Sequence, residues 1–87
     1  MKSELIIDKS GDKLWKLPNG KLHRENGPAV LDIKGGKSWH LNGKLHRGDG
    51  SAIEYSDGRK LWFLNDIQYS EKEYKYEMRL IKLEHIL

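Results

Sequence analysis

The chain contains no cysteine, so no disulfide and no thiolate-bound metal can stabilise it. It has no apolar run longer than a few residues, which is too short to cross a membrane. Its first ten residues, "MKSELIIDKS", lack the apolar core of a signal peptide. These absences predict a cytoplasmic protein without a transmembrane segment.

A strong charge of one sign is also missing. The 87 residues carry a net charge of +3, which is well below that of a dedicated nucleic-acid binder. From Ser70 onward the bases and acids are equal in number, so the whole positive excess lies earlier in the chain. A chain of this length predicts a single domain, residues 1–87, with modest stability.

No set of residues indicates catalysis. No serine, acid or histidine stands in a motif with a known mechanism, and we therefore expect no enzyme and no cofactor. Zinc sites show closely spaced ligands with a second Cys or His nearby. The chain offers no such pair, so we expect no metal site; its four histidines are His23, His40, His46 and His85.

What the chain does have is an internal repeat. Three tryptophans, Trp15, Trp39 and Trp62, are 24 and 23 residues apart, and the hexapeptide "NGKLHR" occurs twice. Regular spacing of this kind predicts one structural unit used several times. Around the tryptophans, these residues recur in step: Gly11, Gly35 and Gly58; Leu17, Leu41 and Leu64; His23-Arg24 and His46-Arg47; Gly27 and Gly50; Ala29 and Ala52.

A turn signal precedes each tryptophan by four residues. Asp57-Gly58 is a strong signal for a two-residue hairpin turn, and Lys34-Gly35 and Ser10-Gly11 stand at the matching places. Such turns would place a β-branched residue opposite each tryptophan. The predicted pairs are Ile6–Trp15, Val30–Trp39 and Ile53–Trp62, with Asp8–Lys13 and Asp32–Lys37 as pairs of opposite charge.

The expected fold is mainly β. Residues 5–69 would form an antiparallel β-meander of about six strands, built from hairpin units of about 23 residues. Trp15, Trp39 and Trp62 would lie on one face and form the core. Residues 70–87 would form a C-terminal α-helix, opened by a capping box of Ser70 and Glu73. This helix would cover either the tryptophan face or the last strands.

The pattern Trp-x-x-Asn-Gly-Lys-x-His, followed by Gly-x-Ala and Asp-Gly, resembles the MORN repeat. The strings "PNGKLHRENGPA" and "LNGKLHRGDGSA" look closest to a variant common in small bacteriophage proteins. Arg24 and Arg47 stand where MORN units have glycine. The resemblance implies successive hairpins, a phage protein working in the host cytoplasm, and the protein-scaffolding and lipid-binding roles associated with MORN units.

The His-Arg pairs are the main candidate site, with two readings. In one, Arg24 and Arg47 form a basic row with Lys21, Lys44 and His40, which would bind an acidic partner. In the other, the pairs hold the loops between hairpins. We expect a division of labour in which His23 and His46 hold the loop and the arginines point to solvent.

We therefore expect a protein-binding module that occludes the surface of a host protein. A phage protein of this type would inhibit bacterial defence, in the manner of an anti-CRISPR protein. Two alternatives stay open: an accessory protein that binds nucleic acid, and a scaffold at a membrane surface. The sequence names no partner and no oligomeric state.

Overall fold

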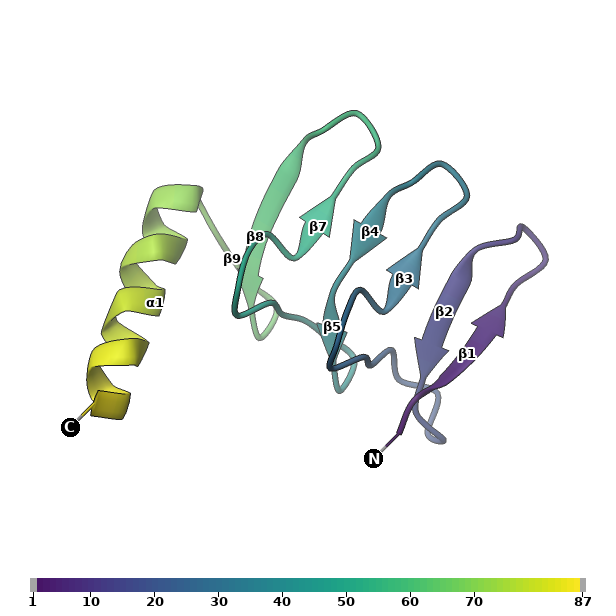
Figure 1. The fold of residues 1–87 in the computed structure, drawn as a ribbon, viewed down its shortest axis with the longest axis horizontal. Coiled ribbons are helices and arrows are strands. Elements are labelled where there is room, and N and C mark those ends of the chain that lie inside the picture. The colour runs from purple at the N-terminus through teal and green to yellow at the C-terminus, as the bar shows by residue number, and fades with distance from the viewer. Residues whose placement is uncertain (1, 87) are drawn as a thin grey trace.

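The computed structural model describes residues 2–86 and is mainly β, with one C-terminal helix. Seven strands form an antiparallel meander in the spatial order β1-β2-β3-β4-β7-β8-β9 (Figure 1). The strands of this sheet are β1 (Glu4–Ile7), β2 (Lys13–Lys16), β3 (Val30–Leu31), β4 (Lys37–Ser38), β7 (Ile53–Glu54), β8 (Lys60–Leu64) and β9 (Ile67–Tyr69).

Two further short strands, β5 (His40–Leu41) and β6 (Lys44–Leu45), form a separate hairpin. The sheet exceeds the expected six strands because the chain folds back once more after β8. Asn65 and Asp66 both adopt positive φ, 49° and 69°, and form the tight turn that leads into β9. A two-residue hairpin turn of this type requires positive φ at both central residues, and Asn and Asp tolerate it well.

The predicted hairpin register is wrong by one residue in all three hairpins. Leu5 pairs with Trp15, Val30 with Ser38 and Ile53 with Leu61. Each loop has three residues instead of two, and within it only the glycine has positive φ, 91° to 94°. A type I turn followed by such a glycine spares Ser10, Lys34 and Asp57 the left-handed conformation that L-residues resist.

The aspartates before these turns also have a different role from the one predicted. The Asp8 carboxylate accepts the amides of Ser10 and Asp12 at 2.9 and 3.0 Å. The Asp32 carboxylate accepts those of Lys34 and Gly36 at 2.9 and 2.8 Å. These bonds close the loops, as Asp side chains commonly do in turns. The aspartates form no ion pair with lysines across the hairpin within residues 2–86.

The observed register aligns one row of side chains across six strands. Because directly paired residues lie on the same face, the row runs without a break. Trp15 and Trp62 each follow a row member in their own strand and therefore point to the opposite face. We call the face that carries the row the back face; the row is Ile6, Leu14, Val30, Ser38, Ile53 and Leu61.

Helix α1 (Glu71–Ile86) begins where the capping box predicts. The Ser70 hydroxyl accepts the Glu73 amide at 3.1 Å, and the Glu73 carboxylate accepts the Ser70 amide at 2.9 Å. The expected end of the helix, Leu87, lies outside the described residues. Helix α1 lies at the end of the sheet beside β8 and β9, so it covers the last strands and not the whole tryptophan face (Figure 1).

The molecule is thin, with extents of 45 × 32 × 17 Å. Its buried apolar side chains are few: Leu17, Ala29, Ala52, Leu64 and Tyr74. The tryptophans are only half-buried, which corrects the prediction that they form the interior core. A sheet of one layer has no second layer to enclose large rings, so they need another cover.

We predict that Ser70→Ala destabilises the protein by about 1 kcal/mol, because it removes the hydroxyl that caps α1. Urea unfolding followed by circular dichroism measures the change. Ser56→Ala is the matched control, since Ser56 is exposed in a hairpin loop. Equal midpoints for the two variants would show that the cap contributes nothing.

Candidate functional site

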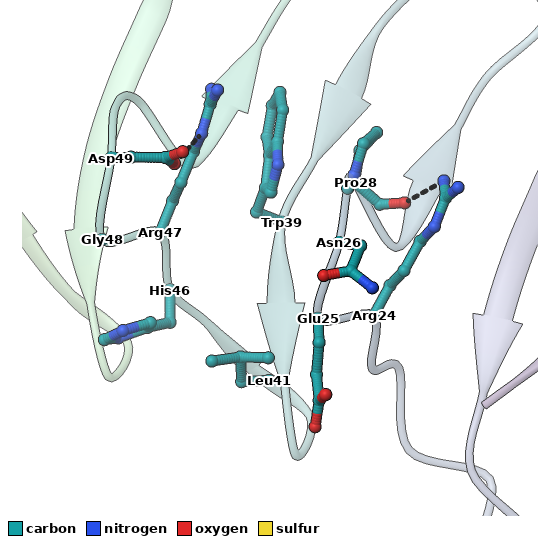
Figure 2. Close-up of a pocket in the computed structure, with 11 residues that line it drawn as sticks. Arg24, Glu25, Asn26, Pro28, Trp39, Leu41, His46, Arg47, Gly48 and Asp49 are labelled. Carbon is teal, nitrogen blue, oxygen red and sulfur yellow. Dashed lines mark hydrogen bonds and ion pairs between the residues drawn. The ribbon is translucent and has the colours of Figure 1, made fainter. Parts of the chain in front are cut away.

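The face opposite the back face carries arginines stacked on tryptophans. The Arg24 guanidinium lies 3.8 Å from the centre of the Trp15 ring, and that of Arg47 lies 3.7 Å from Trp39. Each guanidinium also donates to a backbone carbonyl four residues on, Pro28 at 3.2 Å and Ser51 at 3.0 Å. Figure 2 shows Arg47 lying against Trp39. Stacking and hydrogen bonding together fix both arginines on the sheet.

The small residues of the repeated motif make room for this stacking. A Cβ on Gly27 or Gly50 would come within 3.1 Å of the guanidinium carbon of the neighbouring arginine. Ala29 and Ala52 are completely buried immediately before β3 and β7, where their backbones bond to neighbouring strands. The spacing Arg-x-x-Gly-x-Ala is therefore explained by the space that one guanidinium needs beside the sheet.

The histidines hold the turn of the following unit. His23 Nδ1 accepts the Asn42 amide at 2.9 Å, and His46 Nδ1 accepts the Asn65 amide at 3.1 Å. Asn42 and Asn65 both begin tight turns with positive φ. The hydrogen bond of each histidine thus links one unit to the next, between residues 19 positions apart in the chain.

The arginines do not point to solvent as predicted. The prediction assumed that His and Arg alternate sides along an extended strand. The segments 23–29 and 46–52 are loops instead. They bond to neighbouring strands but are not strands themselves, so their side chains do not alternate between two faces. Arg24 and Arg47 fold back onto the tryptophans of their own units and are unsuited to reach a partner.

Arg47 has more partners than Arg24. Its Nε donates to the Asp49 carboxylate at 2.9 Å, and its Nη1 donates to Glu54 at 3.1 Å. Ser51 donates to the same Glu54 oxygen at 2.8 Å. Burial alone would raise the pKa of Glu54, but the Ser51 hydroxyl and the Arg47 charge outweigh it and lower the pKa. Glu54 is therefore ionised at neutral pH and balances Arg47.

The other residues predicted to bind a partner lie at the turns or near the back face, apart from the stacked arginines. Lys21 and Lys44 are exposed at the turns, and the alkyl chain of Lys21 lies beside Gly43. His40 is half-buried near the back face, where its Nε2 lies 2.9 Å from the Ser38 hydroxyl. The His40 Nδ1 atom is buried and has no hydrogen-bond partner within the described part of the chain. The structure does not unite these side chains with Arg24 and Arg47 in one basic row.

The third unit ends differently. Ser70 replaces the stacked arginine, and the buried Tyr74 of α1 takes over the contact with the preceding loop. The Tyr74 hydroxyl donates to the Arg47 carbonyl at 2.5 Å and accepts the Gly50 amide at 3.2 Å. The sequence analysis did not anticipate this bond, because nothing in the sequence shows which loop the helix meets.

Two of the grooves on this face lie at equivalent places in successive units. The first, about 490 Å³, lies between Arg24 and Pro28 on one side and Trp39 and Arg47 on the other (Figure 2). The second, about 740 Å³, lies at the equivalent place one unit later, where α1 forms its outer wall. Both are bordered by equivalent side chains, so one structural reason produces them: the gap between the loop of one unit and the tryptophan of the next.

Among the side chains that the structure describes, those of residues 2–84, no cluster is suited to hold a metal ion. Helix α1 lacks the length and apolar character that a membrane-spanning helix requires, and it is the single helix in this range. No protein-family model, no curated protein and no solved structure matches the chain. The MORN-like character and the phage origin therefore remain predictions from the sequence.

We predict that Arg47→Ala destabilises the protein by about 2 kcal/mol, because stacking, a backbone hydrogen bond and two ion pairs are lost together. Arg24→Ala should cost less, since Arg24 has no ion pair within residues 2–86. Chemical unfolding measures both. Exposed Arg79→Ala is the control and should stay within about 0.5 kcal/mol of the parent. A parent-like Arg47→Ala would contradict the structural role.

His40 should make stability depend on pH. Burial lowers the pKa of His40, so the native state keeps the ring neutral while the unfolded chain takes up a proton near pH 6.5. The free energy of unfolding should therefore fall as the pH decreases from about 7.5 to 5.5. His40→Phe, which copies Phe63 of the third unit, should reduce this slope in thermal unfolding measured across that range. An unchanged slope would assign it to other groups.

Proposed function

We propose that the chain is a non-enzymatic protein-binding module that acts by covering a surface of its partner. The resemblance to phage repeat proteins makes the partner a host protein, and inhibition of bacterial defence the consequence. The proposal rests on one observation, the unusually large exposed surface of a thin sheet.

The exposed area of the chain is 6386 Å². A compact monomer of this mass exposes only about 5,300 Å². The difference of about 1,100 Å² is comparable to the area of about 800 Å² that each partner contributes to an interface of standard size. The protein thus has enough uncovered surface for one such interface without unfolding any part of it.

The back face has the chemistry that suits a protein partner. Its row is aliphatic except for Ser38, and Ile6 at the sheet edge is 43% exposed. Lys16 and Phe63 lie two residues beyond row members in their own strands and so share the face. Helix α1 makes its main contacts with β8 and β9, at one end of the sheet. The other members of the row are half-buried, so each keeps part of its surface accessible. An apolar centre with a polar margin is typical of protein interfaces.

The tryptophan face is less suited to this role over its first two units. There the arginines are bound to tryptophans and carbonyls, and Glu54 balances Arg47. A partner would have to replace these contacts before gaining its own. This argues for the back face as the principal contact surface.

We predict that Ile6→Lys with Ile53→Lys abolishes capture of the partner, because two lysines would interrupt the apolar row. Tagged protein would be used to capture partners from bacterial lysate, with quantitative mass spectrometry as the readout. Leu80→Lys with Leu83→Lys is the matched control, since it makes the same change on the exposed side of α1. One protein should be enriched by the parent and the control and lost with the back-face variant.

Purified partner then completes the test, since its own activity should fall when the parent protein is added. The melting temperature of each variant must be measured, so that loss of folding is separated from loss of binding. Equal capture by the back-face variant would contradict the proposed surface. Absence of any enriched protein, together with salt-dependent binding to an oligonucleotide, would contradict the proposed function itself.

A further inference from the structure

The groove between the sheet and α1 differs from its counterpart in the preceding unit. It is the larger of the two, about 740 Å³, and the apolar side chains that line it come from both walls: Trp62 from β8, and Tyr74 and Met78 from α1. Tyr74 bonds to the loop of the second unit and so fixes the distance between the walls. The groove is therefore held open by contacts within the chain.

Trp62 is the tryptophan without a stacked arginine in the described range 2–86. The residue equivalent to Arg24 and Arg47 is Ser70, which caps the helix instead. The indole is half-buried and borders the groove. No described arginine therefore makes the ring contact at Trp62 that arginines make in the earlier units, and a ligand in the groove could make it instead.

The charges of the groove do not balance. Arg47, Lys60, Lys75, Arg79 and Lys82 face three carboxylates, those of Asp49, Glu54 and Glu71. Arg47 is bound to two of these carboxylates, and Lys75 is paired with Glu71 at 3.3 Å.

Three cations then remain on the rim. Lys60, Arg79 and Lys82 make no ion pair with the described side chains, those of residues 2–84, and all three are exposed. Lys60 lies opposite Glu54 in the sheet and lowers its pKa, so its charge is partly balanced. Arg79 and Lys82, one turn apart on α1, are the least balanced.

We propose that this groove binds an acidic peptide segment of a partner protein, with an apolar side chain seated against Trp62 and Met78. The inference rests on the proposed function as a protein-binding module and adds a second contact of defined chemistry. Glutamates or aspartates of the segment would pair with Arg79 and Lys82 on the rim. Charge complementarity at a rim sets specificity and association rate, while the apolar side chain supplies the anchor.

A peptide fits better than a nucleic acid. Asp49, Glu54 and Glu71 pair with Arg47 and Lys75, so only three cations remain for a ligand, which is few for a continuous line of phosphates. A peptide can place its carboxylates at Arg79 and Lys82 and offer neutral amides to these acids. The apolar side chain of the peptide also suits the apolar parts of the two walls, Trp62 and Met78.

The test uses a short synthetic peptide with glutamates on both sides of a Leu-Phe pair, and the same peptide with glutamine for every glutamate. Calorimetry measures affinity, and nuclear magnetic resonance follows the Trp62 indole N–H. Arg79→Glu with Lys82→Glu should weaken binding of the acidic peptide by about tenfold or more. Lys21→Glu with Lys44→Glu makes the same change in net charge away from the groove and should alter affinity less than about twofold.

The acidic peptide should bind the parent protein, shift the Trp62 signal, and bind more tightly than the glutamine peptide. Equal affinity for both peptides, an equal loss in the control variant, or shifts confined to other residues would overturn the inference. So would tighter binding of a single-stranded oligonucleotide, or no peptide binding at all. The back-face variant, Ile6→Lys with Ile53→Lys, should still bind the peptide, so failure of the groove is distinguishable from failure of the proposed function.

Discussion

The stacking of one arginine on one tryptophan is the interaction on which this sheet depends. A sheet of one layer cannot bury its large rings, and its buried apolar set includes two alanines and none of the three tryptophans. The guanidiniums of Arg24 and Arg47 lie over the half-buried rings of Trp15 and Trp39 and act as part of the missing layer. A planar cation suits this position, because it stacks on an indole and still offers donors in its plane to nearby carbonyls.

This interaction explains how the chain connects its units. Each arginine needs a glycine three residues later and a buried alanine five residues later, and the preceding histidine bonds to the next turn. Every unit thus depends on its neighbour, as in other repeat proteins. The last unit has no following turn to hold, and Tyr74 of α1 replaces the missing partner by bonding to the loop of Arg47.

The sequence predicted the features that local chemistry determines. The β-meander and the start of α1 directly after its cap, Ser70, follow from turn residues and a capping box, and the structure confirms both. The predicted hairpin register was wrong because a glycine after a turn residue fits both a two-residue and a three-residue loop. The prediction that the arginines point to solvent was wrong, because their direction is set by stacking on a tryptophan, which a rule of strand alternation does not consider. The groove at α1 was beyond prediction, since it requires knowing where the helix lies.

The same constraint separates the two faces of the sheet. Over the first two units, the tryptophan face satisfies its own rings and charges, so a partner gains little there. The back face keeps a half-buried row that is aliphatic except for Ser38, and helix α1 makes its main contacts at the far end of the sheet, with β8 and β9. The stacking series ends at Trp62, where no arginine follows, and the cations of α1 lie beside this ring. The two proposed contact surfaces therefore lie where the repeated contact is absent: on the back face, and at the end of the series beside the helix.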